Sequence, residues 1–450
     1  MIKIINMRKI IIGLTLSIMI WGAPDVSAQD SLVIDLSKAF DLALERNESI
    51  LIAKKEMDRA NARIMEAVAG ALPQITGGVT YLRNWEIPTG VFQMDNEVVR
   101  FKFGTENNFT AGITLNQPLY SGGRTLTALK IASLAKKLVR HSIRQATQDL
   151  KFQVYNTFYG TLLAQDVLQV NLESLRLAED NLDQVQKMYD QGVSAEFDLL
   201  RARVAVANLQ PAVIKARNDA KIAMDALKNM LGIELGMAVD LVADFDSSNF
   251  ILPPVDRETA EQELLKNRPE LNMSELNTSI NKKLITMASS GYKPVLNFST
   301  SLQYQRQFDR GGVFDRSWDR SINSVVSLQI PIFDSWRTPS QVKQAKVEYT
   351  QSRLQDQAVR KAMILDFEQS MGRYLESRNR LAAQGDAVEL ARRGLAIANV
   401  RFESGVGTQL EVADARLSLS VAEINRASAY HDLAISYAAL LRSLGRDINP

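Results

Sequence analysis

Few residues of this chain are placed where they could make or break covalent bonds. The sequence contains two histidines, His141 and His431, and no cysteine. Each histidine lies in a stretch with helical periodicity, away from the other and without serine, acidic or metal-binding partners at a useful spacing. No phosphate-binding loop of the GxxxxGK[ST] kind occurs. The residues therefore argue against an enzyme and predict neither a cofactor nor a metal site.

Two carboxylates have a more informative spacing. Glu411 and Asp414 follow Gly405 by six and nine residues, and because they are three apart they would share one face of a helix. Solvated faces of coiled coils commonly carry such charges. The same pair repeated in several copies around an axis would instead form rings that favour cations and repel one another. The residues alone leave both interpretations open.

The elements that would position these carboxylates occur twice. A glycine follows a proline after 74 positions in both halves of the chain, and many residues match at a constant offset of 213. The matching pairs are Leu115 and Leu328, Pro118 and Pro331, Arg124 and Arg337, Gly192 and Gly405, Ala202 and Ala415, Arg203 and Arg416, and Leu231-Gly232 and Leu444-Gly445. Because loops tolerate insertions and packed elements do not, this 118-residue stretch predicts two copies of one packed unit.

Each unit should contain a long helical hairpin, over residues 121–232 and 338–445. Residues 124–189 hold no proline and one glycine, and their apolar residues step by 3 and 4 as in a coiled coil. Such a helix would be roughly 100 Å long. Gly192 and Gly405 should reverse the chain. Thr338 and Pro339 suit the N-cap and the first turn of the second long helix.

Each unit should also contain a strand hairpin, over residues 74–118 and 294–331. Apolar and polar residues alternate there, most clearly from Leu296 to Gln305, over a length that could cross a bilayer when tilted. The connecting loops, 84–107 and 305–321, are polar. A helix over 36–69 and another over 257–290 should precede the hairpins, and residues 233–256 should link the two units.

The N-terminus has the pattern of a cleaved export signal over residues 1–28. A basic segment precedes a short apolar core and the small-residue site Val26-Ser27-Ala28, so the mature chain should begin at Gln29. Without cysteine it would not be lipidated. Removing the signal leaves 50 basic and 50 acidic residues, a balance that gives no support to nucleic-acid binding. The two units would then cover residues 29–256 and 257–450.

Four strands cannot close a membrane barrel, because the smallest usual barrel has eight. Two chains would supply eight strands and three would supply twelve. An eight-stranded barrel is filled by side chains, whereas twelve strands can leave a lumen. A pore therefore favours a homotrimer, in contact with membrane lipid.

The order and spacing of several motifs make the chain resemble the TolC-like outer-membrane efflux proteins, over essentially all of the mature sequence. The motifs are Gly70-x-x-Pro73 and Gly291-x-x-Pro294, Gln117-Pro118-Leu119-Tyr120-Ser121-Gly122-Gly123, and Gly192-x5-Asp198-Leu199-Leu200-x-Ala202 with its echo Gly405-x5-Glu411-Val412-x-Asp414-Ala415. The resemblance implies an α+β membrane protein: a trimer with a 12-stranded outer-membrane barrel continuous with a periplasmic helical barrel. Such channels export small molecules or proteins that they receive from an inner-membrane transporter through a periplasmic adaptor.

The resemblance also implies two sites. The helix-turn tips would dock the adaptor, through Gln191, Gly192, Val193, Ser404, Gly405 and Val406. Alternatively, the glycines only make the turns. The periplasmic gate would contain Glu411, Asp414, Asp198 and Phe402. The sequence departs from the family's best-known gate, since Phe402 has no hydroxyl and Gly407 has no side chain where some members bond through a tyrosine and an arginine.

Two other protein classes have long helical hairpins. A periplasmic adaptor has one such hairpin flanked by small β domains, and a structural coiled-coil protein has no membrane-length strands. The two strand hairpins argue against both.

Overall fold

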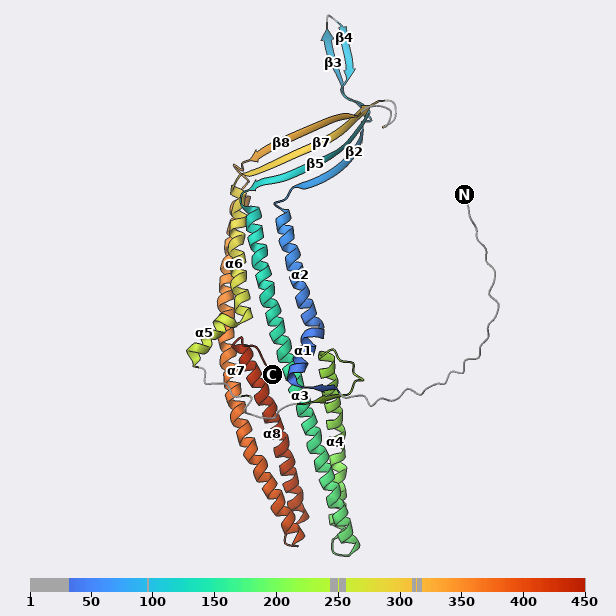
Figure 1. Ribbon diagram of the computed structural model, residues 1–450, viewed down its shortest axis with the longest axis vertical. Coiled ribbons are helices and arrows are strands. Elements are labelled where there is room, and N and C mark those ends of the chain that lie inside the picture. Colours follow the sequence, from blue (N-terminus) through green and yellow to red (C-terminus); the bar gives the residue numbers. More distant parts are fainter. Residues whose placement is uncertain are drawn as a thin grey trace, which may run out of the picture.

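The computed structural model describes residues 32–94, 97–242, 250, 256–309, 313 and 318–449. Long helices run side by side below a curved sheet, and a small hairpin projects above it (Figure 1). The expected export signal, residues 1–28, lies outside the described residues.

The four long helices have matched lengths in the two halves of the chain. Helices α3 (Arg124–Asp190) and α7 (Arg337–Glu403) have 67 residues each, and α4 (Glu196–Met230) and α8 (Gln409–Ser443) have 35 each. Each long helix is therefore about 100 Å long. No helix in the described part of the chain is long and apolar enough to cross a membrane.

Both long helices begin after two residues in the left-handed region. Before α3 these residues are Gly122 and Gly123, with φ of 65° and 86°; before α7 they are Ser335 and Trp336, with φ of 57° and 64°. Side chains are strained there by roughly 1–2 kcal/mol each. The prediction that Thr338 is the N-cap is wrong, because α7 begins one residue earlier and Trp336 occupies the cap.

Asp334 makes the bonds that an N-cap side chain would make at the start of α7. Its carboxylate accepts hydrogen bonds from the backbone N–H of Thr338, at 2.9 Å, and from the hydroxyl of the same residue. These hydrogen bonds lower the pKa of Asp334 below its ordinary value.

The helix expected over 36–69 is two helices, α1 (Leu36–Arg46) and α2 (Glu48–Ala69). Asn47 separates them, and its side chain accepts a hydrogen bond from Ser49 N–H at 3.0 Å. The helix expected over 257–290 is likewise divided into α5 (Arg257–Asn267) and α6 (Pro269–Ser289), followed by the short helix η2 (Ser290–Tyr292). Arg268 is extended because the following proline disfavours helical backbone in the residue before it.

The sheet has the strand order β2-β5-β7-β8, all antiparallel, with β2 (Gln74–Arg83) and β8 (Asp319–Gln329) at its edges. The central strands are β5 (Asn107–Ser121) and β7 (Val295–Phe308). The register confirms the expected alternation, because directly opposed residues share a face. Ile75 lies opposite Leu115, Ile113 opposite Leu302, and Leu302 opposite Ile322.

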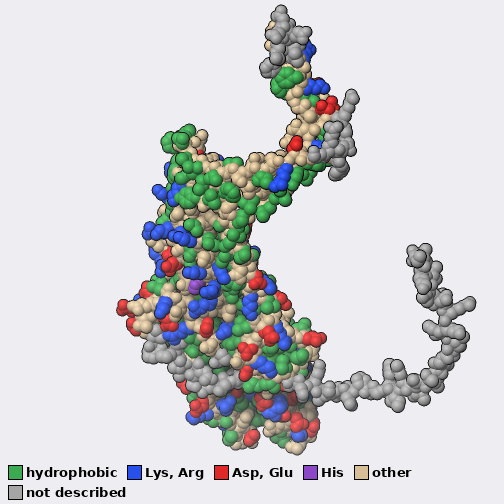
Figure 2. Space-filling view, turned by 45° about the horizontal axis from the view of Figure 1, so that its top comes forward, with side chains coloured by type: hydrophobic (Ala, Val, Ile, Leu, Met, Phe, Trp, Pro, Cys, Tyr) green, Lys and Arg blue, Asp and Glu red, His purple; other side chains and the backbone are tan. Residues whose placement is uncertain are grey.

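One face of this sheet is therefore apolar across all four strands. The other carries rows such as Thr114 opposite Ser301 and Ser301 opposite Asn323. Hydrophobic side chains gather over the sheet in Figure 2, whereas charged side chains gather on the helical part below it.

Two connections contain strands that the sequence did not predict. The first polar loop, 84–107, holds the hairpin of β3 (Thr89–Met94) and β4 (Glu97–Lys102). The segment between the two halves, 233–256, contains β6 (Val239–Leu241), which pairs in parallel with β1 (Leu32–Ile34).

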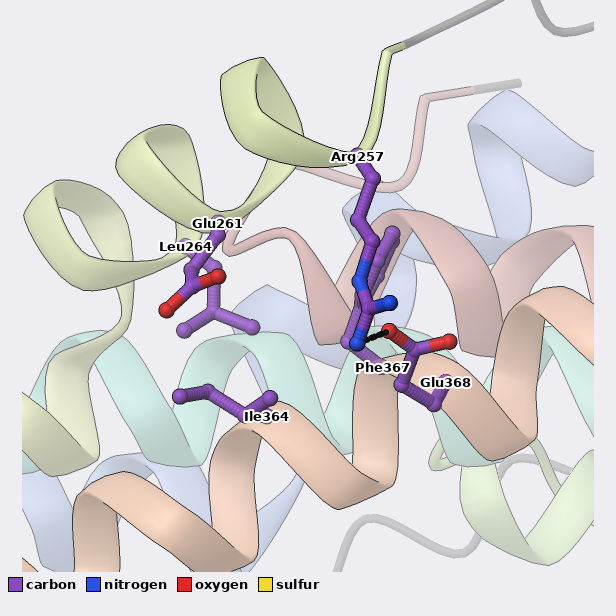
Figure 3. A pocket seen from close by; sticks show the side chains of 6 residues that line it. All are labelled: Arg257, Glu261, Leu264, Ile364, Phe367 and Glu368. Carbon is purple, nitrogen blue, oxygen red and sulfur yellow. Dashed lines mark ion pairs between the residues drawn. The ribbon is translucent and has the colours of Figure 1, made fainter.

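The main hydrophobic core lies halfway along the helices, where α3 and α8 pack against each other and the shorter helices meet them. Phe158 of α3 and Leu264 of α5 are fully buried there. Figure 3 shows α5 on α7: Leu264 points toward Ile364 and Phe367, and Arg257 forms an ion pair with Glu368 at 2.8 Å.

A bidentate ion pair attaches the C-terminal segment to α5. Arg446 Nε and Nη2 donate to the two carboxylate oxygens of Glu263, both at 2.7 Å. This contact lowers the pKa of Glu263.

We expect Glu263→Gln to lower the free energy of unfolding by about 1 kcal/mol at pH 7, because the charge-assisted pair is lost. A depressed carboxyl pKa stabilises the fold above the unfolded-state value, and this stabilisation is lost as pH falls through the folded-state value. The difference between variant and wild type in thermal unfolding should therefore shrink toward pH 3. Glu275→Gln, at an exposed position in the interior of α6 and without an ion pair among the described residues, is the control and should behave as wild type. A difference that does not change with pH would contradict this assignment.

Candidate functional site

The two helix-turn tips have the same backbone. Gly192 and Gly405 both take left-handed conformations, with φ of 77° and 75°. The following valines close the turns: Val193 N–H donates to Met188 O at 2.9 Å and Val406 N–H to Arg401 O at 3.1 Å. This six-residue hydrogen bond is typical of a glycine-terminated helix, so the prediction that the glycines reverse the chain is confirmed.

The expected docking residues lie at the surface of these turns. Val193 is 69% exposed and Val406 is 70% exposed. Gln191, Gly192, Ser404 and Gly405 are exposed as well. An apolar side chain that is largely in water at the end of a long rod is available to a partner.

Each tip has a small hydrophobic core of its own. The core of the first tip consists of Val185, Leu199 and Ala202. The core of the second tip consists of Leu395, Ala398 and Val412. Phe402 packs against the second cluster and is partly buried. In this structure Phe402 therefore stabilises its own hairpin.

The absence of a side chain at position 407 has a geometric cause. A Cβ added to Gly407 would lie 2.9 Å from the backbone carbonyl carbon and the Cβ of Arg401. Gly407 N–H also donates to Arg401 O at 2.9 Å. A side chain at position 407, such as the arginine expected from the resemblance, would therefore clash with the backbone of this turn.

Glu411 lies in the first turn of α8 and its carboxylate has local partners. Arg401 Nε donates to it at 3.2 Å, from the last turn of α7. Thr408 caps α8, accepting from Glu411 N–H at 3.3 Å and donating to the Glu411 carboxylate at 3.4 Å. The charge of Glu411 is thus partly compensated within the chain.

Asp414 lies one turn further along α8 and is exposed. Within the described chain its carboxylate has no hydrogen bond or ion pair. Together with Arg401 and Glu411 it lines a surface hollow of about 430 Å³ between α7 and α8, where the small residues Gly394 and Ala415 leave space. Arg401, Glu411 and Asp414 thus form one charged group, with Asp414 as its unpaired member.

Asp198 belongs to the other hairpin, in the first turn of α4, and is half-buried. Among the described residues, no hydrogen bond or ion pair joins Asp198 to Glu411, Asp414 or Phe402. The structure brings Glu411 and Asp414 together and leaves Asp198 apart.

Arg416 matches Arg203 in the repeat, but the sequence does not indicate that the two side chains have different contacts. Arg416 of α8 reaches across to α3, where its Nη1 donates to Leu177 O at 2.8 Å. Burial lowers the pKa of this guanidinium, and Asp180 opposes that shift. Its repeat equivalent, Arg203, is exposed and bonds to Gln186 of its own hairpin at 3.0 Å.

The histidines lie on different helices, as the sequence predicts. His141 is in α3, where burial and the neighbouring Arg144 and Arg140 lower its pKa. His431 is in α8, 3.2 Å from Asp432. The described residues contain no cluster of three or more histidine or acidic side chains that could hold a metal ion.

Comparison with known proteins places this architecture among relatives. The outer membrane efflux protein family model matches residues 39–233 and 260–446. The outer membrane protein TolC of Vibrio cholerae is 22% identical over 419 residues, covering 91% of this chain and 90% of that protein. The TolC protein of Escherichia coli K12 is 23% identical over 454 residues, covering 98% and 86%. Among solved structures, a channel-forming protein named CusC has a TM-score of 0.77 at 19% identity, covering 92% of this chain and 94% of its own.

These matches span nearly the whole described chain and both helical hairpins. Proteins of this kind are outer-membrane efflux channels, which are transport conduits and not enzymes. The chain belongs to the outer membrane efflux protein family.

Proposed function

We propose that three copies of this chain form an exit duct: a 12-stranded barrel in the outer membrane continuous with a helical barrel in the periplasm. An inner-membrane transporter would deliver small molecules or proteins to it through a periplasmic adaptor. In this proposal residues 1–28 are a cleaved signal, the mature chain is not lipidated, and residues 29–256 and 257–450 are two tandem repeats.

The open edges of the sheet support pairing between copies of the chain most directly, and a lumen favours three copies over two because eight strands are filled by side chains. All residues of β2 and of β8 are exposed in the single chain, and each strand leaves one backbone edge without a partner. In lipid an unpaired backbone group costs several kcal/mol, so the edges must pair. Pairing β8 of one protomer with β2 of the next closes the sheet, and three copies supply twelve strands.

The surface chemistry of the sheet fits a membrane. The apolar face would contact lipid and the face with Thr114, Ser301 and Asn323 would line the lumen. Aromatic side chains flank the apolar band, as the aromatic girdles of membrane barrels do. Phe109 packs on Trp318 at one end, and Tyr292 and Trp336 are exposed at the other.

The matched helices support a tube below the barrel. Each protomer would contribute two hairpins of 67- and 35-residue helices, so three protomers give six hairpins of equal length. Helices that enclose one tube must match in length, which explains why the repeat tolerates no insertion there.

Glu411 and Asp414 would line the periplasmic mouth, which the tips surround. Three copies would form two stacked acidic rings. Because Arg401 partly compensates Glu411, the Asp414 ring would carry most of the free negative charge. Asp198, on the first hairpin, and Phe402, in the core of the second tip, would complete the gate.

We expect chemical crosslinking of outer-membrane fractions to yield a trimer. Engineered cysteines at the sheet edges, one in β2 and one in β8, should form disulfides between protomers, since the natural chain has no cysteine to compete. A matched pair at directly opposed positions of β5 and β7, which are neighbours within one protomer, should link within the chain and give no intermolecular product. A monomer in the soluble fraction would contradict the proposal.

We expect Asp414→Asn to reduce the cation selectivity of the channel in planar bilayers more than Glu411→Gln does. Arg401→Gln should raise selectivity, because it frees the charge of Glu411. Glu389→Gln serves as the control, since Glu389 is exposed on α7 and paired with Arg393. Equal reversal potentials in all four variants would exclude these carboxylates from the mouth.

We expect Val193→Asp and Val406→Asp to weaken binding of the cognate adaptor at least tenfold, because a charge replaces an exposed apolar contact. Channel conductance without adaptor should be unchanged. Ile214→Asp, at an exposed site higher on α4, is the control. Adaptor affinity that is unaffected by both tip variants would refute docking at the tips.

A further inference from the structure

The upper and lower halves of the helices are held together very differently. In the upper half, α8 packs on α3 through the main core, and Arg442 pairs with Asp149 at 2.6 Å. The aromatic side chains of Phe250, Tyr430 and Tyr437 cluster at the lower end of this core, with ring centroids 5.5 and 5.7 Å apart. Down to this level the two hairpins form one packed body.

Below that level the hairpins separate. A hollow of about 910 Å³ lies between α3, α7 and α8, with the aromatic rings at its upper end. Its lining includes charged side chains from all three helices: Asp166, Glu173, Arg378, Glu423 and Arg426. Further down, each tip has its own separate core, and among the described residues no hydrophobic cluster at this level joins one hairpin to the other.

Arg416 crosses this gap below the hollow. Of the hydrogen bonds and ion pairs joining residues 124–230 to residues 337–443 in the described chain, the bond from Arg416 to Leu177 O lies nearest the tips. We call this contact the Arg416 bridge. It joins α8 to α3 two residues beyond Asp414.

The bridge is not an incidental surface contact. The Nε of Arg416 is buried and has no hydrogen-bond partner among the described residues, so the side chain is desolvated to reach the Leu177 carbonyl. Exposed arginines avoid that cost, as Arg203 does at the equivalent position of the first hairpin. A guanidinium kept partly buried at a cost in free energy indicates a constraint on where α8 lies.

We propose that Arg416 is a positioning residue that holds the α7–α8 hairpin against α3 and thereby sets the aperture at the height of Glu411 and Asp414. This inference rests on the proposed channel function. Breaking the bridge frees the second hairpin to swing outward from the level of the aromatic cluster, because no other polar bond described below the hollow restrains it. Arg203 of the first hairpin forms no such bridge, because it bonds within its own hairpin. In a trimer, opening would therefore occur at the three α7–α8 hairpins and not at the three α3–α4 hairpins.

The first test is a distance within one protomer. Because the chain lacks cysteine, spin labels can be attached at Glu179→Cys on α3 and Leu417→Cys on α8, both exposed, in protomers diluted with unlabelled chains. Arg416→Gln should increase the population at the longer distance about tenfold, the loss expected for one hydrogen bond to a charged group. Arg203→Gln is the matched control from the other repeat and should leave the distribution unchanged. An unchanged distribution in Arg416→Gln would overturn the proposal.

Arg416→Lys provides a second, milder variant in case glutamine impairs folding. Lysine keeps the charge and a donor but lacks the reach and planar geometry of arginine, so it should give an intermediate distribution. A distribution identical to wild type with correctly folded Arg416→Lys and Arg416→Gln proteins would count against the bridge.

The second test is conductance in planar bilayers. Arg416→Gln should raise it, and Arg203→Gln should not. A longer spin-label distance without any rise in conductance would refute the role in setting the aperture. If wild-type protein forms no conducting trimer, the proposed function fails, whereas the distances within one protomer still decide whether Arg416 holds the two hairpins together.

Discussion

The unpaired backbone edges of β2 and β8 are the constraint on which the rest of the structure depends. A chain that places four strands in lipid must pair those edges, and a single chain cannot do so. Copies of the chain can, and a closed arrangement of copies requires every protomer to present strands and helices of the same length. The equal lengths of α3 and α7, and of α4 and α8, are what such closure demands.

The two repeats share a backbone but use different side chains at the same positions. Gly122 and Gly123 enter the first long helix without strain, whereas Ser335 and Trp336 adopt the same conformation at a cost and rely on Asp334. At the lower end, Arg203 remains in solvent and Arg416 crosses to α3. The differences place both mouth carboxylates and the Arg416 bridge on the second hairpin. A threefold rather than sixfold tube, with one movable hairpin per protomer, would follow.

Much of the fold could be predicted from periodicity. The long helices, their glycine turns and the alternating strands extend over many residues, so local sequence and tertiary structure agree. Periodicity did not predict the breaks at Asn47 and Arg268, although Pro269 signals the second one. The strand pairing of β1 with β6 could not be predicted, because it joins residues about 200 positions apart through two very short strands.

The site was predictable in position and less so in detail. Spacing identified Glu411, Asp414 and the glycines of the turns. It did not reveal that Arg401 and Thr408 engage Glu411, that Phe402 packs into its own hairpin, or that Gly407 has no space for a side chain. These depend on the distance between two antiparallel helices. The match of Arg203 with Arg416 was visible in the sequence, but only the structure shows that the two side chains point to different partners.

Hydrogen exchange of the backbone amides in the four strands tests the central claim most directly. In a closed assembly of copies, the amides of β2 and β8 are paired between protomers and should exchange as slowly as those of β5 and β7. Rapid exchange along the outer edges of β2 and β8 in the membrane-embedded protein, with β5 and β7 protected, would contradict a closed barrel.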